Sequence, residues 1–115
     1  EVMCQEQSQK IKSVEVTEEV HDDNKVKTFV ESRIYYDIKG NIIEEIQYKN
    51  GDFVSHFAYE YDAANNKVKE TEYNKDGGIK KVSKYTYENN LRTEKLVYDK
   101  NGKLKSKRVY KYTTF

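Results

Sequence analysis

The sequence contains no proline, no tryptophan and a single cysteine, Cys4. The missing proline fits a chain built mostly of paired strands, because proline cannot donate a hydrogen bond to a β-ladder. One cysteine excludes a disulfide within the chain. No apolar run approaches the roughly 18 residues that a membrane-spanning helix needs, so the sequence predicts no membrane span.

Tyrosine and charge are what the sequence has in abundance. Its 115 residues include 11 Tyr, 21 Lys+Arg and 20 Asp+Glu, and only 36% are hydrophobic with every Tyr counted. A low apolar fraction is typical of disorder, but disordered chains are usually poor in aromatics and rich in proline. We therefore expect one folded, strand-rich domain with a thin core.

The net charge of +1 hides an asymmetry along the chain. Residues 1–62 carry 7 basic and 14 acidic side chains, whereas residues 63–115 carry 14 basic and 6 acidic ones. A basic half can indicate an anionic partner. The alternative is an uneven scatter of charges over solvated faces.

Tyrosines recur with a period of about 25 residues in two interleaved series, which indicates an internal repeat. The first series is Tyr36, Tyr61, Tyr87 and Tyr112, and the second is Tyr48, Tyr73 and Tyr98. Segments rich in Asn, Asp and Gly follow the tyrosines, at 37–41, 49–52, 62–66, 74–78, 88–90 and 99–103. These residue types tolerate the positive φ of tight hairpins, so the spacing predicts strands of roughly 7 to 10 residues between turns.

Side chains alternate between the turns with the period of 2 that marks strands, as in Phe53, Ser55, Phe57, Tyr59 and Tyr61. Strands joined by short hairpins are antiparallel neighbours. The predicted fold is all-β, an antiparallel meander of about eight strands built from double-hairpin repeats of about 25 residues. Residues 10–115 are expected to form a single β-repeat domain, and residues 1–9 a flexible N-terminal lead-in.

One face of this sheet is predicted to be rich in tyrosine. Tyr48, Tyr73 and Tyr98 are expected near one end of the sheet. The tyrosines expected near the opposite end are Tyr59, Tyr61, Tyr85, Tyr87, Tyr110 and Tyr112. Charged residues interrupt the same face at mid-strand, and hairpin register predicts Glu94 opposite Arg108. A sealed barrel would bury such charges at high cost. An open twisted sheet is therefore favoured over a closed up-and-down barrel, or a sheet whose Tyr face packs on a partner.

The segments Tyr35–Ile43 and Tyr59–Val68 resemble the Tyr-Asp (YD, or RHS-type) repeats of bacterial cell-surface proteins, whose pattern is Tyr-Asp-x-x-Gly-Asn/Arg-apolar. The likeness covers roughly residues 35–112, although Asn65 stands in the usual Gly position and Glu88 replaces Asp in the third copy. The chain is also similar to uncharacterised secreted proteins of Bacteroidetes. The resemblance implies an extracytoplasmic β-repeat protein without catalytic residues.

Catalytic chemistry has few candidates in this sequence. His21 and His56 are the only histidines, and neither belongs to a Cys/His cluster with metal-ligand spacing. Ser55 and His56 are neighbours on a predicted strand and so point to opposite faces. The pair Glu70 and Glu72 is expected on the polar face, without a pocket to separate their pKa values. The sequence therefore predicts no enzyme, no catalytic residue, no metal and no cofactor.

The predicted binding site is an aromatic platform with basic residues interleaved. Its members are Tyr59, Tyr61, Tyr85, Tyr87, Tyr110, Tyr112, Lys105 and Arg108. Such a platform can stack sugar rings or a protein surface, whereas the alternative is that these rings form the core of a protein short of aliphatic residues.

The predicted function is a non-catalytic module, secreted or at the periplasmic or cell-surface side of the envelope, that binds a protein or glycan through its Tyr-rich face. Nucleic acid is disfavoured because the net charge is near zero and the lysines alternate between faces. A homo-oligomer could form through the Tyr face or a sheet edge. The alternative function is an intracellular interaction protein of the immunity or antitoxin type.

Overall fold

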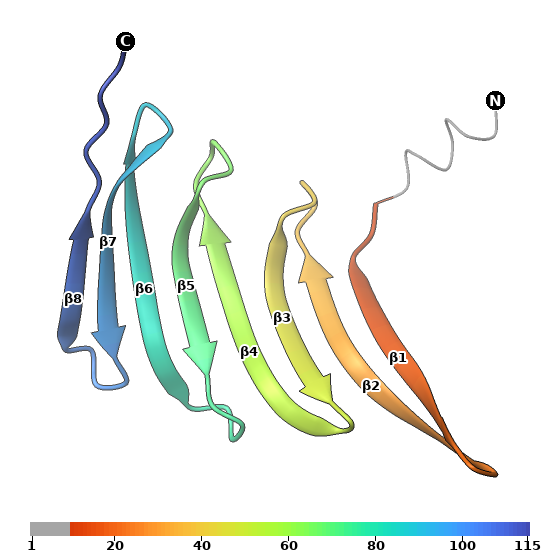
Figure 1. Cartoon of the computed structure of the whole chain (residues 1–115). Helices are drawn as coiled ribbons and strands as arrows, with labels where there is room; N and C mark the ends of the chain where they lie inside the picture. Colours follow the sequence, from red (N-terminus) through yellow and green to blue (C-terminus); the bar gives the residue numbers. More distant parts are fainter. Residues whose placement is uncertain (1–9) are drawn as a thin grey trace, which may run out of the picture. The chain divides into compact units, whose positions relative to one another are not determined.

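The computed structural model of the chain describes residues 10–115, which form a single antiparallel meander (Figure 1). Its strands are β1 (Ser13–Asp22), β2 (Lys25–Tyr36), β3 (Ile42–Lys49), β4 (Asp52–Tyr61), β5 (Lys67–Tyr73), β6 (Ile79–Glu88), β7 (Leu91–Asp99) and β8 (Leu104–Val109). They hydrogen-bond in sequence order in one open sheet. The predicted all-β meander and its open form are confirmed, and the closed-barrel alternative is not formed. The predicted lead-in, residues 1–9, lies outside the described residues.

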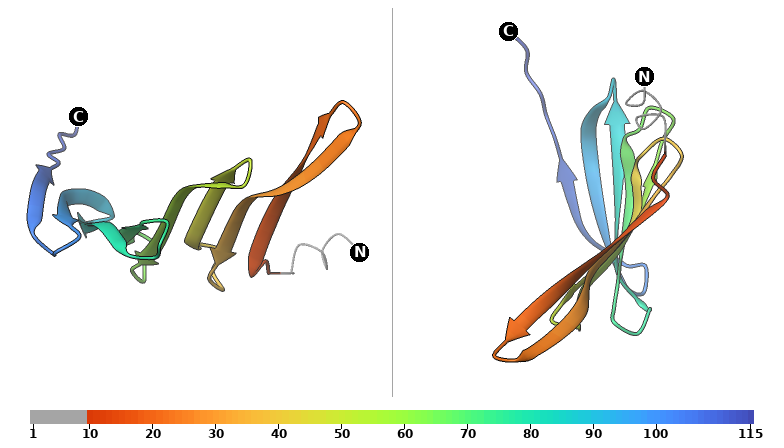
Figure 2. Two further views of the ribbon diagram at one scale, coloured as in Figure 1. Left: turned by 90° about the horizontal axis from the view of Figure 1, so that it is seen from below. Right: turned by 90° about the vertical axis from the view of Figure 1, so that its right-hand side faces the viewer.

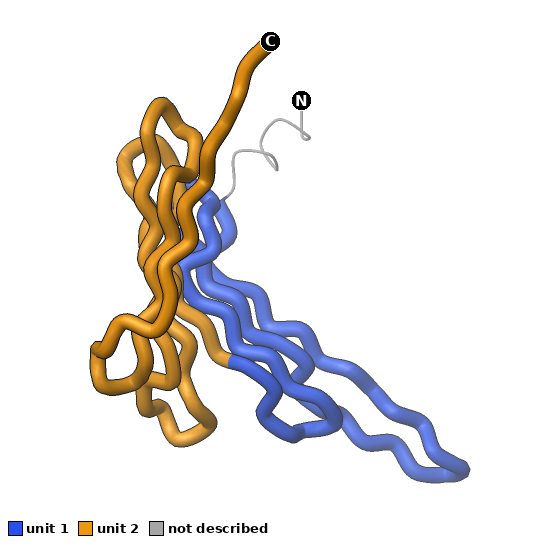
Figure 3. Tube along the Cα trace, turned by 60° about the vertical axis from the view of Figure 1, so that its left-hand side comes forward, with its two compact units in different colours: residues 1–55 blue, residues 56–115 orange. Residues whose placement is uncertain are grey.

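The chain divides into two compact units, residues 1–55 and residues 56–115 (Figure 3). The boundary falls inside β4, so the second unit holds the end of that strand together with β5 to β8. Within each unit the strands form a single layer (Figure 2). All eight residues of the predicted binding site belong to the second unit.

Four hairpin turns share one hydrogen-bond pattern. In the β2–β3 turn, the Asp37 N–H donates to the Asn41 carbonyl at 2.9 Å and the Gly40 N–H donates to the Asp37 carbonyl at 3.0 Å. The Asp37 Oδ1 accepts from the backbone N–H of Lys39 and of Asn41, each at 2.9 Å. The equivalent turns begin at Asp62, Asn74 and Asp99. These turns are where the sequence places Asp, Asn and Gly, because an Asx carboxyl or amide can replace missing backbone partners.

An extra residue follows each of five turns and forms a β-bulge. In the β4–β5 pairing, Tyr61 lies opposite Lys67 while Glu60 lies opposite Lys69, so Val68 has no partner across the ladder. The equivalent residues after the other four turns are Ile43, Lys80, Thr93 and Lys105. A bulge sets two residues against one, which shifts the alternation of side chains by one position for the rest of the strand.

The sequence-based assignment of faces is wrong beyond these bulges. Tyr85 lies opposite Lys95, whereas Tyr98 lies opposite Val82 and therefore points to the other side of the sheet. Residues directly opposite each other on paired strands share a face. In the second unit we call the two sides the Tyr85 face and the Tyr98 face. The predicted single tyrosine face is thus divided between both sides of the sheet.

Three further expectations are corrected for the same reason. Glu70 lies opposite Tyr59 and Ser83, on the Tyr85 face and not on the polar face where the sequence placed it. Glu72 lies on that face as well, opposite Lys81. Glu94 is paired with Val109 and not with Arg108, which lies opposite Lys95. The bulge in the β7–β8 ladder moves this last register by one residue.

The core is thin, as the composition predicts. Among the described residues, Tyr85 is the only buried hydrophobic side chain, at 6% exposure. Thr71 and Ser83 are buried with it, at 7% and 2%. All three lie on β5 and β6, so the best-packed part of the chain is the middle of the second unit.

We expect Gly77→Ala to destabilise the protein by about 1 kcal/mol, because Gly77 has a φ of +90° and an L side chain is strained there. A Cβ at Gly77 would meet nothing within 4 Å, so the cost is confined to the backbone. Gly77→Asn is the matched control, since Asn65 adopts a φ of +65° in the equivalent turn and should be tolerated with a smaller loss. Urea unfolding measures both variants, and equal losses for Ala and Asn would contradict this origin of the strain.

Candidate functional site

Tyrosine rings and cations alternate across the Tyr85 face of the second unit. The Lys67 Nζ lies 5.1 Å from the ring centroid of Tyr59 and 5.4 Å from that of Tyr85. The Arg92 guanidinium carbon lies 4.1 Å from the Tyr85 centroid and 5.9 Å from that of Tyr110. We call Tyr59, Lys67, Tyr85, Arg92 and Tyr110 the tyrosine–cation row. Each such contact stabilises the fold by about 0.5 to 2 kcal/mol, more where it is shielded from water.

The row repeats with the period of the sequence. Lys67 and Arg92 stand one tyrosine period apart, and each lies opposite a tyrosine at the end of the preceding strand. The Tyr87 hydroxyl donates to the Lys67 carbonyl at 2.6 Å, and the Tyr112 hydroxyl donates to the Arg92 carbonyl at 2.7 Å. These two hydroxyl bonds are equivalent, so the tyrosines of this series hold the start of a neighbouring strand in place.

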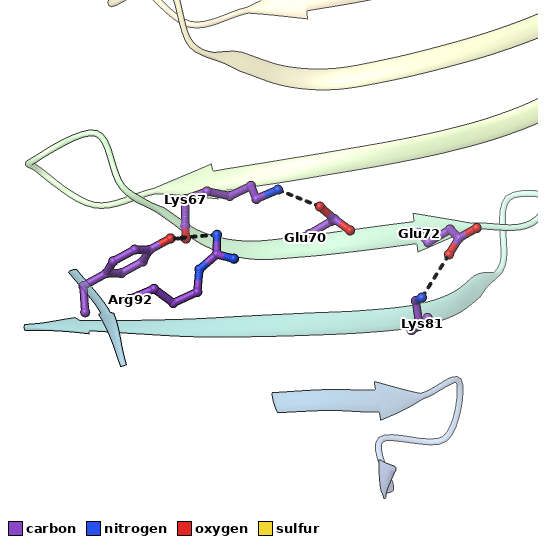
Figure 4. Close-up of polar contacts among 6 residues, drawn as sticks. Lys67, Glu70, Glu72, Lys81 and Arg92 are labelled. Atoms are coloured by element: carbon purple, nitrogen blue, oxygen red, sulfur yellow. Dashed lines mark hydrogen bonds and ion pairs between the residues drawn. The ribbon is translucent and has the colours of Figure 1, made fainter. Parts of the chain in front are cut away.

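The bulges decide which charged residues can meet on this face. Residues three apart on a regular strand point to opposite sides. Because Val68 is the extra residue of a bulge, the Lys67 Nζ nevertheless reaches the Glu70 Oε1 at 2.8 Å (Figure 4). The equivalent bulge at Thr93 brings both Arg92 and Lys95 over the Tyr85 ring, at 4.1 Å and 5.7 Å from its centroid.

Arg92 is the most constrained cation of the row. Burial disfavours its charge, but hydrogen bonds to the hydroxyls of Tyr87 and Tyr110 outweigh this, so the pKa of Arg92 is raised. Its Nη2 donates to the Tyr87 hydroxyl at 3.3 Å, whereas its buried Nε has no hydrogen-bond partner. The guanidinium is therefore held by aromatic rings and hydroxyls.

The pKa values of the Tyr85 and Tyr110 hydroxyls are shifted in opposite directions. Burial, followed by the nearby Glu70 carboxylate, raises the pKa of Tyr85, which Lys67 and Arg92 only partly offset. A hydrogen bond from Arg108, followed by one from Arg92, lowers the pKa of Tyr110. The Tyr110 end of the row is thus an environment that favours negative charge.

The structure brings most of the predicted site residues together, but gives them different exposures. Tyr85 is buried, Tyr112 is 51% exposed, and Tyr59, Tyr61, Tyr87 and Tyr110 are half-buried. Tyr110 and Tyr112 are therefore the rings at the β8 end that a ligand can reach.

The two predicted basic residues lie at different ends of β8. Arg108 is exposed and donates a hydrogen bond to Tyr110, so it lies beside the tyrosine–cation row. Lys105 lies beside the preceding turn, where it adds to the effect of the Lys103 backbone N–H in lowering the pKa of Asp99. Lys105 is thus separated from the row.

Sequence reasoning did not single out Lys67, Arg92 and Lys95 as members of the site. A signal was available for the first two, because the spacing from Lys67 to Arg92 equals that from Tyr48 to Tyr73. Lys95 could not be found in this way, since its place on the Tyr85 face depends on the bulge at Thr93.

Among residues 10–115 there is no group of three His, Cys, Asp or Glu side chains that could hold a metal ion, and no helix long and apolar enough to cross a membrane. The His56 ring lies against that of Tyr73, with centroids 4.8 Å apart and the ring planes tilted by 36°. Comparison of the chain with protein-family models, curated proteins and solved structures finds no match. Function is therefore inferred from the chemistry of the described residues.

Replacing Arg92 by Gln should lower the free energy of unfolding by about 1 to 2 kcal/mol, because it removes the cation from the rings of the row. Arg108→Gln is the matched control, since Arg108 is exposed, and its effect should stay within about 0.5 kcal/mol. Urea unfolding of both variants tests the difference. Equal losses would show that the Arg92 contacts contribute nothing beyond an ordinary surface arginine.

Tyr110 should ionise at a lower pH than an ordinary tyrosine, whose pKa is 10.0, and Tyr85 at a higher pH. Since the folded pKa of Tyr110 is the lower one, its ionised form favours the folded state as the pH rises towards 10. Near-ultraviolet absorbance of tyrosinate measures the titration. Tyr110→Phe should remove the part of the titration at the lowest pH, and Tyr85→Phe the part at the highest pH. A Tyr110→Phe curve that keeps the part at the lowest pH would contradict the assignment.

Proposed function

We propose that this protein is a non-catalytic binding module, secreted or associated with the cell envelope, that binds a protein or glycan through the Tyr85 face of its second unit. The tyrosine–cation row carries the proposal. It lies on a single-layer sheet, so no other element of the unit covers it. Tyrosine and arginine on an uncovered face are the residue types that dominate binding energy in macromolecular interfaces.

The chemistry of the row supports binding over catalysis. Catalytic groups usually lie in a pocket that excludes water and separates their pKa values. In the row, the groups with a shifted pKa are Arg92, Tyr85 and Tyr110. Arg92 influences the pKa of both tyrosines, and all three lie on an open face. Such an arrangement fixes the positions of rings and cations, as a recognition surface requires.

The extracytoplasmic location rests on the resemblance to Tyr-Asp repeats. The turns that begin at Asp37 and Asp62 each follow a tyrosine and share one hydrogen-bond pattern. This common geometry explains physically why the Asp of the Tyr-Asp pattern recurs within the chain. We propose on this basis that the module works outside the cytoplasm, where the repeats that it resembles are found.

An array of glycans and proteins, followed by titration of any ligand found, tests the proposal. The variant Tyr110→Ala/Tyr112→Ala should lose at least about tenfold in affinity, since these rings are the accessible ones at the β8 end. Tyr85 is left intact because it is buried and its loss would destabilise the unit. Circular dichroism checks that the variants fold.

Tyr98→Ala is the matched control, because Tyr98 is a half-buried tyrosine on the opposite face. It should leave the affinity unchanged. If no ligand loses affinity with the double variant, or if Tyr98→Ala weakens binding equally, the Tyr85 face is not the binding surface and its rings are only structural.

A further inference from the structure

The last repeat carries a lysine where the preceding repeat carries a carboxylate. Glu70 and Lys95 occupy equivalent positions of the repeat, since each stands three places after a cation of the tyrosine–cation row. In the earlier repeat the pair is neutral, because Lys67 and Glu70 form an ion pair at 2.8 Å. In the last repeat Arg92 and Lys95 have the same sign and lie over the same Tyr85 ring.

A third cation joins them from the neighbouring strand. Arg108 lies directly opposite Lys95 in the β7–β8 pairing. Like charges that face each other destabilise a sheet. The ion pairs found among residues 10–115 involve other cations than Arg92, Lys95 and Arg108. We call these three residues, with Tyr110, the Arg92 cluster.

Elsewhere on this face, the lysines Lys67, Lys80 and Lys81 each lie within ion-pair distance of a carboxylate. Besides the Lys67–Glu70 pair, the Lys81 Nζ lies 3.8 Å from the Glu72 Oε1 (Figure 4), and the Lys80 Nζ lies 3.5 Å from the Glu72 Oε2. Uncompensated positive charge is therefore concentrated at the β7–β8 end of the Tyr85 face. The buried Arg92 Nε, which has no hydrogen-bond partner, belongs to the same place.

We propose that the Arg92 cluster binds a carboxylate of an acidic polysaccharide, with an adjoining sugar ring on Tyr110 and Tyr112. This inference rests on the function proposed above and names its ligand. Arginine recognises carboxylates through paired hydrogen bonds, and Lys95 adds a mobile charge beside it. A tyrosine ring offers an apolar surface to the C–H face of a sugar and a hydroxyl to its oxygens.

Charge density favours a polysaccharide with spaced carboxylates over nucleic acid. A nucleic acid brings a phosphate with every nucleotide. Along the row those phosphates would approach Glu70 and Glu72, which lie on the same face. An acidic peptide fits less well, because extended peptides usually add to a sheet edge through their backbone, whereas the cluster lies on the face.

Binding of hyaluronate, a polysaccharide in which only every second sugar carries a carboxylate, tests the proposal by titration calorimetry at several salt concentrations. The native chain should bind it, and more weakly as salt increases. Lys95→Glu gives the last repeat the charge pattern of the preceding one and should lower the affinity at least tenfold. Lys84→Glu is the matched control, since Lys84 is exposed on the opposite face, 5.3 Å from the Tyr98 centroid, and should change the affinity less than twofold.

If circular dichroism shows that Lys95→Glu does not fold, Arg108→Gln takes its place and should also lower the affinity. An equal loss with Lys84→Glu would overturn the proposal, as it would mean attraction by overall charge. Tighter binding of poly-glutamate or of a single-stranded oligonucleotide would overturn the ligand class. If other array ligands depend on Tyr110 and Tyr112 but hyaluronate does not bind, the proposed function stands and this inference fails.

Discussion

The β-bulge after each turn is the constraint on which the rest of the second unit depends. A strand without bulges would turn Lys67 and Glu70 to opposite faces, and likewise Arg92 and Lys95. With the bulges at Val68 and Thr93, each pair shares the Tyr85 face. The same register shift sends Tyr98 to the other side. Backbone geometry at one residue after a turn therefore determines both the ion pairs and the tyrosine contacts of the sheet.

A single-layer sheet has no second layer against which to bury its side chains, and the tyrosine–cation row compensates in part for this. The Lys67 ammonium lies over the rings of Tyr59 and Tyr85, and the Arg92 guanidinium lies over those of Tyr85 and Tyr110. Neighbours in the row lie on adjacent strands, or directly after β8 in the case of Tyr110, and so tie these segments together. The only apolar side chain buried among residues 10–115 lies in the middle of the row.

The sequence was sufficient to predict the meander but not the faces of its strands. The tyrosine period and the Asp, Asn and Gly turns report local backbone requirements, so strand number and order followed from them. The bulge residues Ile43, Val68, Lys80, Thr93 and Lys105 share no side-chain type, because a bulge here is set by turn geometry. Strand register could therefore not be predicted from the sequence, and neither could the pairing of Glu94 or the position of Lys95 on the Tyr85 face.

The two repeats of the second unit differ where the backbone does not require them to agree. Tyr87 and Tyr112 each donate a hydroxyl hydrogen bond to a backbone carbonyl, which only a side chain of that length and chemistry can do. Positions 70 and 95 make no such backbone bond among the described contacts; their side chains meet other side chains. Glu or Lys can therefore stand there without altering the ladder. Charge at this position can change while the fold is kept, so one scaffold can offer a neutral surface in one repeat and a cationic one in the next.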